Sequence, residues 1–299
     1  MTESAPANGA RDARAALPPA TRMGAVRLSV ADLDRSRRWY ERAVGLRPLE
    51  QGTDRLALGA DGEPLVELEA EPGARPSRGH TGLYHLALLL PDRASLARWL
   101  RHAARERVGL VGAADHAVSE AVYLTDPDGH GIEIYADRPR RSWEGRVGEL
   151  MTTVPLDVDD LLTAADDPPD APFAGLPAGT AMGHVHLRVA SVPEAVAFYR
   201  DVLGLELMAS LGSQAAFLAA GGYHHHVGAN SWESRGAPAP PPGTASLRHA
   251  TIVLPDAAVR DAAAGRVAAA GQEPRPAEGG VLVRDPSGNP LLLVAGRPR

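Results

Sequence analysis

The fold is decided by a stretch that occurs twice, MGAVRLSVADLDRSRRWYERAVGL at 23–46 and MGHVHLRVASVPEAVAFYRDVLGL at 182–205. The two copies align without a gap. Each begins with alternating apolar and polar residues, continues with apolar residues at helical spacing, and ends at Gly-Leu. Each copy therefore predicts a strand followed by an amphipathic helix that stops at the glycine.

Two weaker copies of the same pattern begin at Tyr84, with YHLALLLPDRASLARWL, and at Arg248, with RHATIVLPDAAVRDAAAGRV. Both pass through Leu-Pro-Asp into a helix, and both are followed by an Asp-Pro-x-Gly turn and a short apolar strand. Each unit therefore reads as strand, helix and two or three further strands. The four predicted βαβββ units span 23–70, 82–137, 181–229 and 246–296.

The repeats predict an α+β chain with two compact domains. We expect residues 1–22, rich in Ala, Pro and Arg, to form a disordered leader. The first domain then covers 23–137 and the second 181–296. Between them, 138–180 reads as a linker that contains a short helix in LDVDDLLTAADD.

Composition excludes several classes of protein. The chain has 299 residues, 44% of them hydrophobic, a formal net charge of −6 and no cysteine. Disulfides, thiolate metal ligands and a cysteine nucleophile are therefore excluded. No basic stripe indicates nucleic acid or a membrane surface, and no apolar run is long enough for a membrane span. These features favour a cytoplasmic protein without nucleic-acid or membrane partners.

Two histidines and one carboxylate occupy strand positions where such side chains are uncommon. His85 and His184 each stand near the head of an alternating apolar run, and Glu133 lies between two isoleucines in GIEIY. Alternate strand residues point to opposite faces, which predicts that all three face one cleft. Burying a carboxylate is costly unless it is paired or bound to a metal. Two imidazoles and one carboxylate are the ingredients of a divalent metal site with open coordination positions.

The motifs identify a family by resemblance. Those that narrow it are GLYHLALLLPDR at 82–93, DHAVSEAVYLTDPDGHGIEIYADRP at 115–139, and GHVHLRV with GGYHHHVGANSW at 183–189 and 221–232. With the four units they resemble the vicinal oxygen chelate superfamily, and in particular its two-domain bacterial catechol 2,3-dioxygenases. The resemblance covers nearly everything from about residue 23 onward. It implies two domains with cleft-like mixed sheets, each built from paired modules.

In the superfamily, metal ligands come from the first and last strands of two paired modules. In this chain the first unit has Ala25 in a ligand position and the fourth has Leu292, whereas His85, Glu133 and His184 fill theirs. This asymmetry predicts that units two and three face each other around one metal, and that units one and four form a metal-free companion half.

Sequential pairing of neighbouring units is the competing geometry. It would place Glu67 with His85 and Glu133 in one domain. The other domain would then hold a three-histidine set, His184, His226 and His249.

The resemblance implies a non-haem extradiol ring-cleaving dioxygenase that acts on a catechol-type aromatic diol with O2. Fe(II) is the expected metal, with Mn(II) as a substitute, and homo-oligomers are common in the superfamily. Counting alternation back from Val227 predicts that His224 and His226 face the cleft and His225 faces outward. His226 or His224 would then take a proton from the substrate, and Tyr135 would hydrogen-bond it.

Two other functions fit the same fold. A metal-dependent lyase or isomerase of the glyoxalase type would use a fourth protein ligand, for which His226 is the candidate. A small-molecule-binding protein of this fold would hold no metal, which the histidine and carboxylate set disfavours.

Overall fold

A computed structural model describes residues 16–296 of the chain. Each strongly patterned stretch forms the expected strand and helix. Asp32, Asp92, Ser191 and Asp256 cap the helices of the four units by accepting a hydrogen bond from the backbone N–H three residues further on. Gly45 and Gly204 end the first and third at φ of 90° and 100°, a conformation that favours glycine.

The helices are short and lie outside the sheets. Each long copy of the repeat forms an α-helix that continues as a π-helical segment, a local widening in which Tyr40 and Tyr199 lie. The α-helices are α1 (Leu33–Trp39), α2 (Arg93–Arg105), α3 (Val147–Leu150), α4 (Val158–Thr163), α5 (Val192–Val196) and α6 (Ala257–Ala269). The remaining helical segments are η1 (Tyr40–Val44), η2 (Arg140–Ser142) and η3 (Ala197–Leu203).

One large sheet joins units two and three of the chain. Its order is β10-β7-β8-β9-β6-β11-β14-β13-β12, with β6 and β11 antiparallel at the junction of the two units. The strands are β10 (Val154–Pro155), β7 (Leu110–Asp115), β8 (Ser119–Thr125), β9 (Gly131–Asp137), β6 (Gly82–Leu90), β11 (Ala181–Arg188), β14 (Val227–Asn230), β13 (Ala215–Ala219) and β12 (Glu206–Leu211).

A second large sheet joins units one and four. Its order is β17-β18-β19-β16-β1-β4-β3-β2. The strands are β17 (Arg275–Ala277), β18 (Gly280–Arg284), β19 (Pro290–Ala295), β16 (Leu247–Leu254), β1 (Arg22–Val30), β4 (Glu63–Ala70), β3 (Arg55–Ala60) and β2 (Arg47–Gln51). A small parallel pair, β5 (Arg75–Pro76) with β15 (Thr244–Ala245), completes the strands of residues 16–296.

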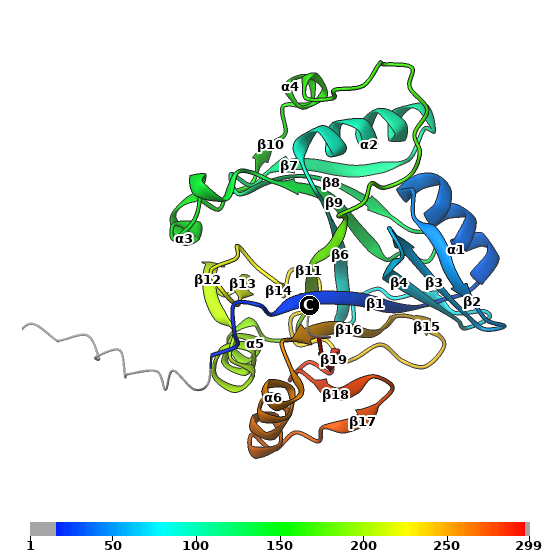
Figure 1. The fold of residues 1–299 in the computed structure, drawn as a ribbon. Helices are drawn as coiled ribbons and strands as arrows, with labels where there is room; N and C mark the ends of the chain where they lie inside the picture. The colour runs from blue at the N-terminus through cyan, green and yellow to red at the C-terminus, as the bar shows by residue number, and fades with distance from the viewer. Residues whose placement is uncertain (1–15, 297–299) are drawn as a thin grey trace, which may run out of the picture.

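The strand order answers the pairing question: units two and three share one sheet, and units one and four share the other. Near the middle of the molecule β1 passes close to β11; α2 packs against β6 and β9 of one sheet, and α6 packs against β16, β18 and β19 of the other (Figure 1). One continuous cluster of buried side chains runs through all four units. The division into 23–137 and 181–296 therefore describes the order of repeats along the chain and stays a prediction about domains.

The predicted leader is in part wrong. Residues 1–15 lie outside the described part of the chain, but residues 16–22 pack on the protein. Leu17 is buried in the core, and its backbone N–H donates to the carbonyl of Gly204. The linker does contain the expected short helix, α4. Among the helices of residues 16–296, none is long and apolar enough to cross a membrane.

Candidate metal centre

Three side chains meet where β6, β9 and β11 lie next to one another. His85 Nε2 is 3.0 Å and His184 Nε2 is 3.2 Å from the same oxygen, Oε2 of Glu133. One candidate ligand atom from each of the three lies within 4.8 Å of the other two. Three protein ligands on neighbouring strands form one face of a metal site and leave the opposite side open.

Strand register explains why these residues meet. His186 pairs with His85 across β11 and β6, and Ala87 pairs with Glu133 across β6 and β9. The β11–β6 ladder is irregular on both sides of His184 to His186, and such irregularities redirect side chains next to functional sites. Ile132 and Ile134 point away from Glu133 into the core, as strand alternation predicts.

The electrostatics favour a cation at this point. Burial alone would raise the pKa of Glu133, which is 2% exposed, but His184 and His85 hold that pKa well below its usual value. Burial lowers the pKa of His184 to about 4, which keeps its imidazole neutral and able to donate an electron pair. Within residues 16–296 the ion-pair partners of Glu133 are these two histidines, so no arginine neutralises the carboxylate.

Unpartnered polar atoms around Glu133 fit a bound metal. His184 Nδ1 and His186 Nε2 are buried and make no hydrogen bond in the described part of the chain. His85 Nε2 is buried and makes no aligned hydrogen bond there either, and it faces the Glu133 carboxylate at 3.0 Å. Buried nitrogens without a partner are rare in proteins and call for an explanation. The residues present therefore fit a divalent metal at His85, Glu133 and His184.

The centre lies in the wall of a large cavity. This cavity has a volume of about 790 Å³, which is in the range of small-molecule sites. His85, Glu133, His184 and His186 all line it, as predicted for the cleft. Its other polar and aromatic walls come from Tyr84, His116, Tyr123, Arg188, Phe217, His225 and Trp232.

The predicted orientation of the three consecutive histidines is wrong. His225 lines the cavity, with its ring centroid 4.0 Å from that of His184, whereas His224 and His226 do not line it. His224 Nε2 lies 2.9 Å from Asp137 Oδ1, and His226 Nδ1 accepts a hydrogen bond from the backbone of Ala220. Strand alternation does not extend to these three histidines, because β14 begins only at Val227.

Tyr135 also lies outside the cavity wall. It is fully buried, and its hydroxyl is 2.8 Å from the hydroxyl of Tyr223. The hydroxyl passes so close to β11 that a Cβ at Gly183 would stand 1.8 Å from it, so this position requires glycine. The catalytic roles predicted for His224, His226 and Tyr135 stay predictions without direct cavity contact to support them.

Tyr123 and His116 are site residues that the sequence did not single out as a pair. The Tyr123 hydroxyl lies 2.6 Å from His116 Nε2, and both residues line the cavity. Burial raises the pKa of Tyr123 well above its usual value, and the charge of Glu133 adds to the shift. The register of β8 on β9 places Tyr123 opposite Glu133, and this pairing has no local signal in the sequence.

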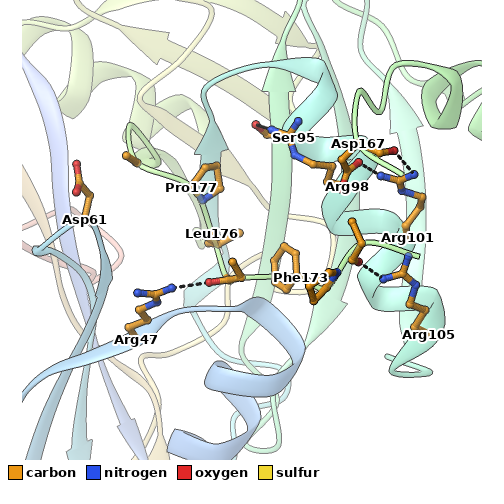
Figure 2. Close-up of a pocket in the computed structure, with 15 residues that line it drawn as sticks. Arg47, Asp61, Ser95, Arg98, Arg101, Arg105, Asp167, Phe173, Leu176 and Pro177 are labelled. Carbon is orange, nitrogen blue, oxygen red and sulfur yellow. Dashed lines mark hydrogen bonds and ion pairs between the residues drawn. The ribbon is translucent and has the colours of Figure 1, made fainter. Parts of the chain in front are cut away.

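A second cavity, of about 410 Å³, separates the linker from α2 and contains none of these residues. Figure 2 shows arginines of α2 and β2 pointing at the linker that passes over them. Arg101 pairs with Asp167, Arg105 donates to the carbonyl of Ala171, and Arg47 donates to that of Ala174. These side chains bind the linker itself. The cavity is therefore a gap between the packed linker and α2, and we assign no ligand to it.

The companion half, units one and four, has an ion pair at the position that corresponds to the candidate metal centre of units two and three. Arg27 pairs with Glu67 at 2.6 Å, and His249 is the register partner of Arg27 across β1 and β16. Burial, reinforced by Arg27, lowers the pKa of His249 to about 4. The predicted ligand positions Ala25 and Leu292 offer no donor atom, so a metal would find only His249 and a carboxylate already paired with Arg27.

A comparison with family models shows which family has this architecture. A family model of the Glyoxalase/Bleomycin resistance protein/Dioxygenase superfamily matches residues 22–134 and 181–293, and the chain belongs to this superfamily. The α+β fold of four βαβββ units with cleft-like mixed sheets is thereby confirmed.

Individual members of this superfamily are similar to the chain in sequence or in structure. Catechol-2,3-dioxygenase of Bacillus subtilis (strain 168) is 44% identical over 277 residues, which cover 89% of this chain and 94% of the relative. Among solved structures, one from Bacillus subtilis subsp. subtilis str. 168 is assigned provisionally as a dioxygenase. It superposes with a TM-score of 0.64 at 16% identity, and the alignment covers 93% of this chain and 86% of that chain. Glyoxalase I from Zea mays has a TM-score of 0.57 at 18% identity and covers 92% of each chain. At such identities the two structures bear on the fold alone.

Proposed function

We propose that the protein is an extradiol ring-cleaving dioxygenase that acts on a catechol-type aromatic diol with O2. The observation that carries the proposal is a buried carboxylate shared by two histidines in the wall of a cavity of about 790 Å³. The 44% identical relative is a catechol-2,3-dioxygenase and supports the same reaction. We expect Fe(II) in the centre, with Mn(II) as a substitute.

Under this proposal His85, Glu133 and His184 hold the metal through Nε2 atoms and a carboxylate oxygen. The bound metal supplies open positions at which both oxygens of a diol and O2 meet, which brings the two reactants into proximity. The rings of Phe217, Trp232 and Tyr84 give the cavity flat apolar walls that suit an aromatic ring.

Polar side chains around the centre would orient the substrate. His225 and Tyr123 line the cavity: the ring of His225 lies 4.0 Å from that of His184, and Tyr123 stands opposite Glu133. We therefore assign to His225 the contact with substrate that the strand pattern gave to His224 and His226. His224 supports the ring of His225, since the Nδ1 atoms of the two residues lie 2.7 Å apart. Asp137 in turn contacts His224 Nε2 at 2.9 Å.

The two alternative functions are less well supported. A glyoxalase-type lyase would use a fourth ligand, but His226 bonds to the backbone of Ala220 and is not among the grouped ligand atoms of residues 16–296. A metal-free binding protein would keep Glu133 buried with no arginine or lysine among its ion-pair partners in residues 16–296. The proposal includes a cytoplasmic location, no nucleic-acid or membrane partner, and assembly into homo-oligomers.

The test is anaerobic purification, elemental analysis, and addition of catechols with oxygen. We expect about one iron per chain, oxygen consumption, and a yellow ring-fission product. Iron-loaded protein that leaves a panel of catechols untouched would overturn the dioxygenase proposal. Conversion of a glutathione hemithioacetal by the same preparation would instead support the lyase.

A further inference from the structure

The turn that precedes the Glu133 strand is held by the opposite half of the molecule. Asp126, in the Asp-Pro-Asp-Gly-His turn of unit two, accepts a hydrogen bond from the Tyr40 hydroxyl at 3.1 Å. Asp128 accepts from Ser36 Oγ at 3.0 Å and from Arg35 at 2.7 Å. Tyr40, Ser36 and Arg35 belong to unit one, whose strands lie in the other sheet.

More contacts fix the same turn. The His130 ring nitrogen Nε2 donates to the carbonyl of Ser29 at 2.9 Å, and Asp128 Oδ1 accepts from the backbone of Ala31. Asp126 also accepts from the backbone N–H groups of Asp128 and His130, which closes the turn on itself. Tyr40, Asp126, Asp128 and His130 are all buried. Buried hydrogen bonds of this kind fix geometry because each partner is costly to leave unsatisfied.

The turn at Asp126 to His130 leads directly into β9, the strand that carries Glu133. Only two residues lie between His130 and Glu133, a span of about 10 Å of strand. We propose that the companion half is a positioning element for the metal centre, and that Tyr40 and Ser36 set the position of Glu133 by clamping this turn. The inference rests on the proposed metal site, and it gives the metal-free half of the molecule a function.

The chain contains its own matched control. In the other repeat, Tyr199 donates to Asp285 at 3.0 Å, and both residues are as buried as Tyr40 and Asp126. That turn leads into β19, which carries Leu292 where β9 carries Glu133. This turn meets the two histidine strands at their ends: Asn289 donates to the carbonyl of Arg188 at 3.2 Å, and Ser287 accepts from the Ala190 N–H and the Thr81 hydroxyl, each at 2.9 Å.

The experiment compares Tyr40→Phe with Tyr199→Phe in the full chain. Each variant loses one buried hydroxyl, so both should lower the melting temperature of the metal-free protein by a similar amount. Co(II) affinity should fall about three- to tenfold in Tyr40→Phe, because altered support of a ligand changes metal binding. In Tyr199→Phe it should stay within about twofold of the unchanged protein. The visible absorption of bound Co(II) should change in Tyr40→Phe alone.

Ser36→Ala is the second variant if Tyr40→Phe does not fold, since it removes another clamp contact through Asp128 and should weaken Co(II) binding in the same direction. Equal Co(II) affinities in the two tyrosine variants, whether both reduced or both unchanged, would overturn the positioning role. Unchanged protein that binds no Co(II) would instead overturn the proposed metal site.

Discussion

The two sheets carry the same repeat but handle a strand carboxylate in opposite ways. In the companion half Glu67 keeps 27% of its side chain exposed and pairs with Arg27. In the half formed by units two and three Glu133 is 2% exposed, and its ion-pair partners among residues 16–296 are His85 and His184. A partly exposed carboxylate is satisfied by one arginine and water, whereas a buried carboxylate with no arginine or lysine to pair with calls for another positive charge. The difference points to a cation in one half and not in the other.

The largest expected effect is on metal binding. Glu133→Ala should lower the affinity for Fe(II) or Mn(II) at least about 100-fold. Removing a residue that hydrogen-bonds to a metal ligand usually costs about 10- to 100-fold in affinity, and removing the ligand itself should cost more. Glu67→Ala, its counterpart in the companion half, should leave the affinity unchanged. Isothermal titration calorimetry measures both, and equal losses in the two variants would break the comparison.

The second effect concerns the packing behind the metal centre. Tyr135→Phe should lower the free energy of unfolding by about 1 kcal/mol, because Tyr223 loses a buried hydrogen-bond partner. Metal content should not change, since Tyr135 does not line the cavity and is not one of the grouped ligand residues. Denaturant unfolding and elemental analysis measure the two quantities. A large loss of ring cleavage with unchanged metal would restore Tyr135 as a residue that contacts the substrate.

The third effect is a pH dependence that belongs to the companion half. The pKa of His249 is about 4 in the folded protein, below the value near 6.5 expected when unfolded. The unfolded state therefore binds a proton first, so stability is complete above pH 6.5 and declines as the pH falls towards 4. With an allowance for partial exposure, His249→Gln should remove about 1 kcal/mol of the loss between pH 7 and pH 5. Identical pH profiles for both proteins would contradict this.

The smallest effect is expected at the ion pair itself. Arg27→Met should change the free energy of unfolding by about 0.5 kcal/mol or less, because partly exposed salt bridges contribute little. Metal affinity should stay the same. A strong effect on metal binding in a calorimetric titration would mean that the two halves are coupled through Arg27.

Much of this organisation could be predicted from the sequence. His85, Glu133 and His184 lie in regular strands, where a period of two fixes the face of each side chain. The blank positions Ala25 and Leu292 predicted which units share a sheet, and the strand order agrees.

The rest depended on backbone geometry that the pattern does not encode. Residues 221–226 form a turn in which Gly221 and Gly222 take positive φ, so alternation does not apply to His224, His225 and His226. The contact of Tyr123 with His116 depends on where one strand lies on another, as does the reach of Tyr40 across the two sheets. Such long-range contacts have no local signal.

The central claim is that one half of the molecule binds a metal and the other does not. Anomalous diffraction from crystals grown with Mn(II) tests it most directly, because each site gives its own peak. We predict one strong peak per chain, bounded by His85, Glu133 and His184, and none between Glu67 and His249. A peak in the companion half, or none at the three ligands, would contradict the account.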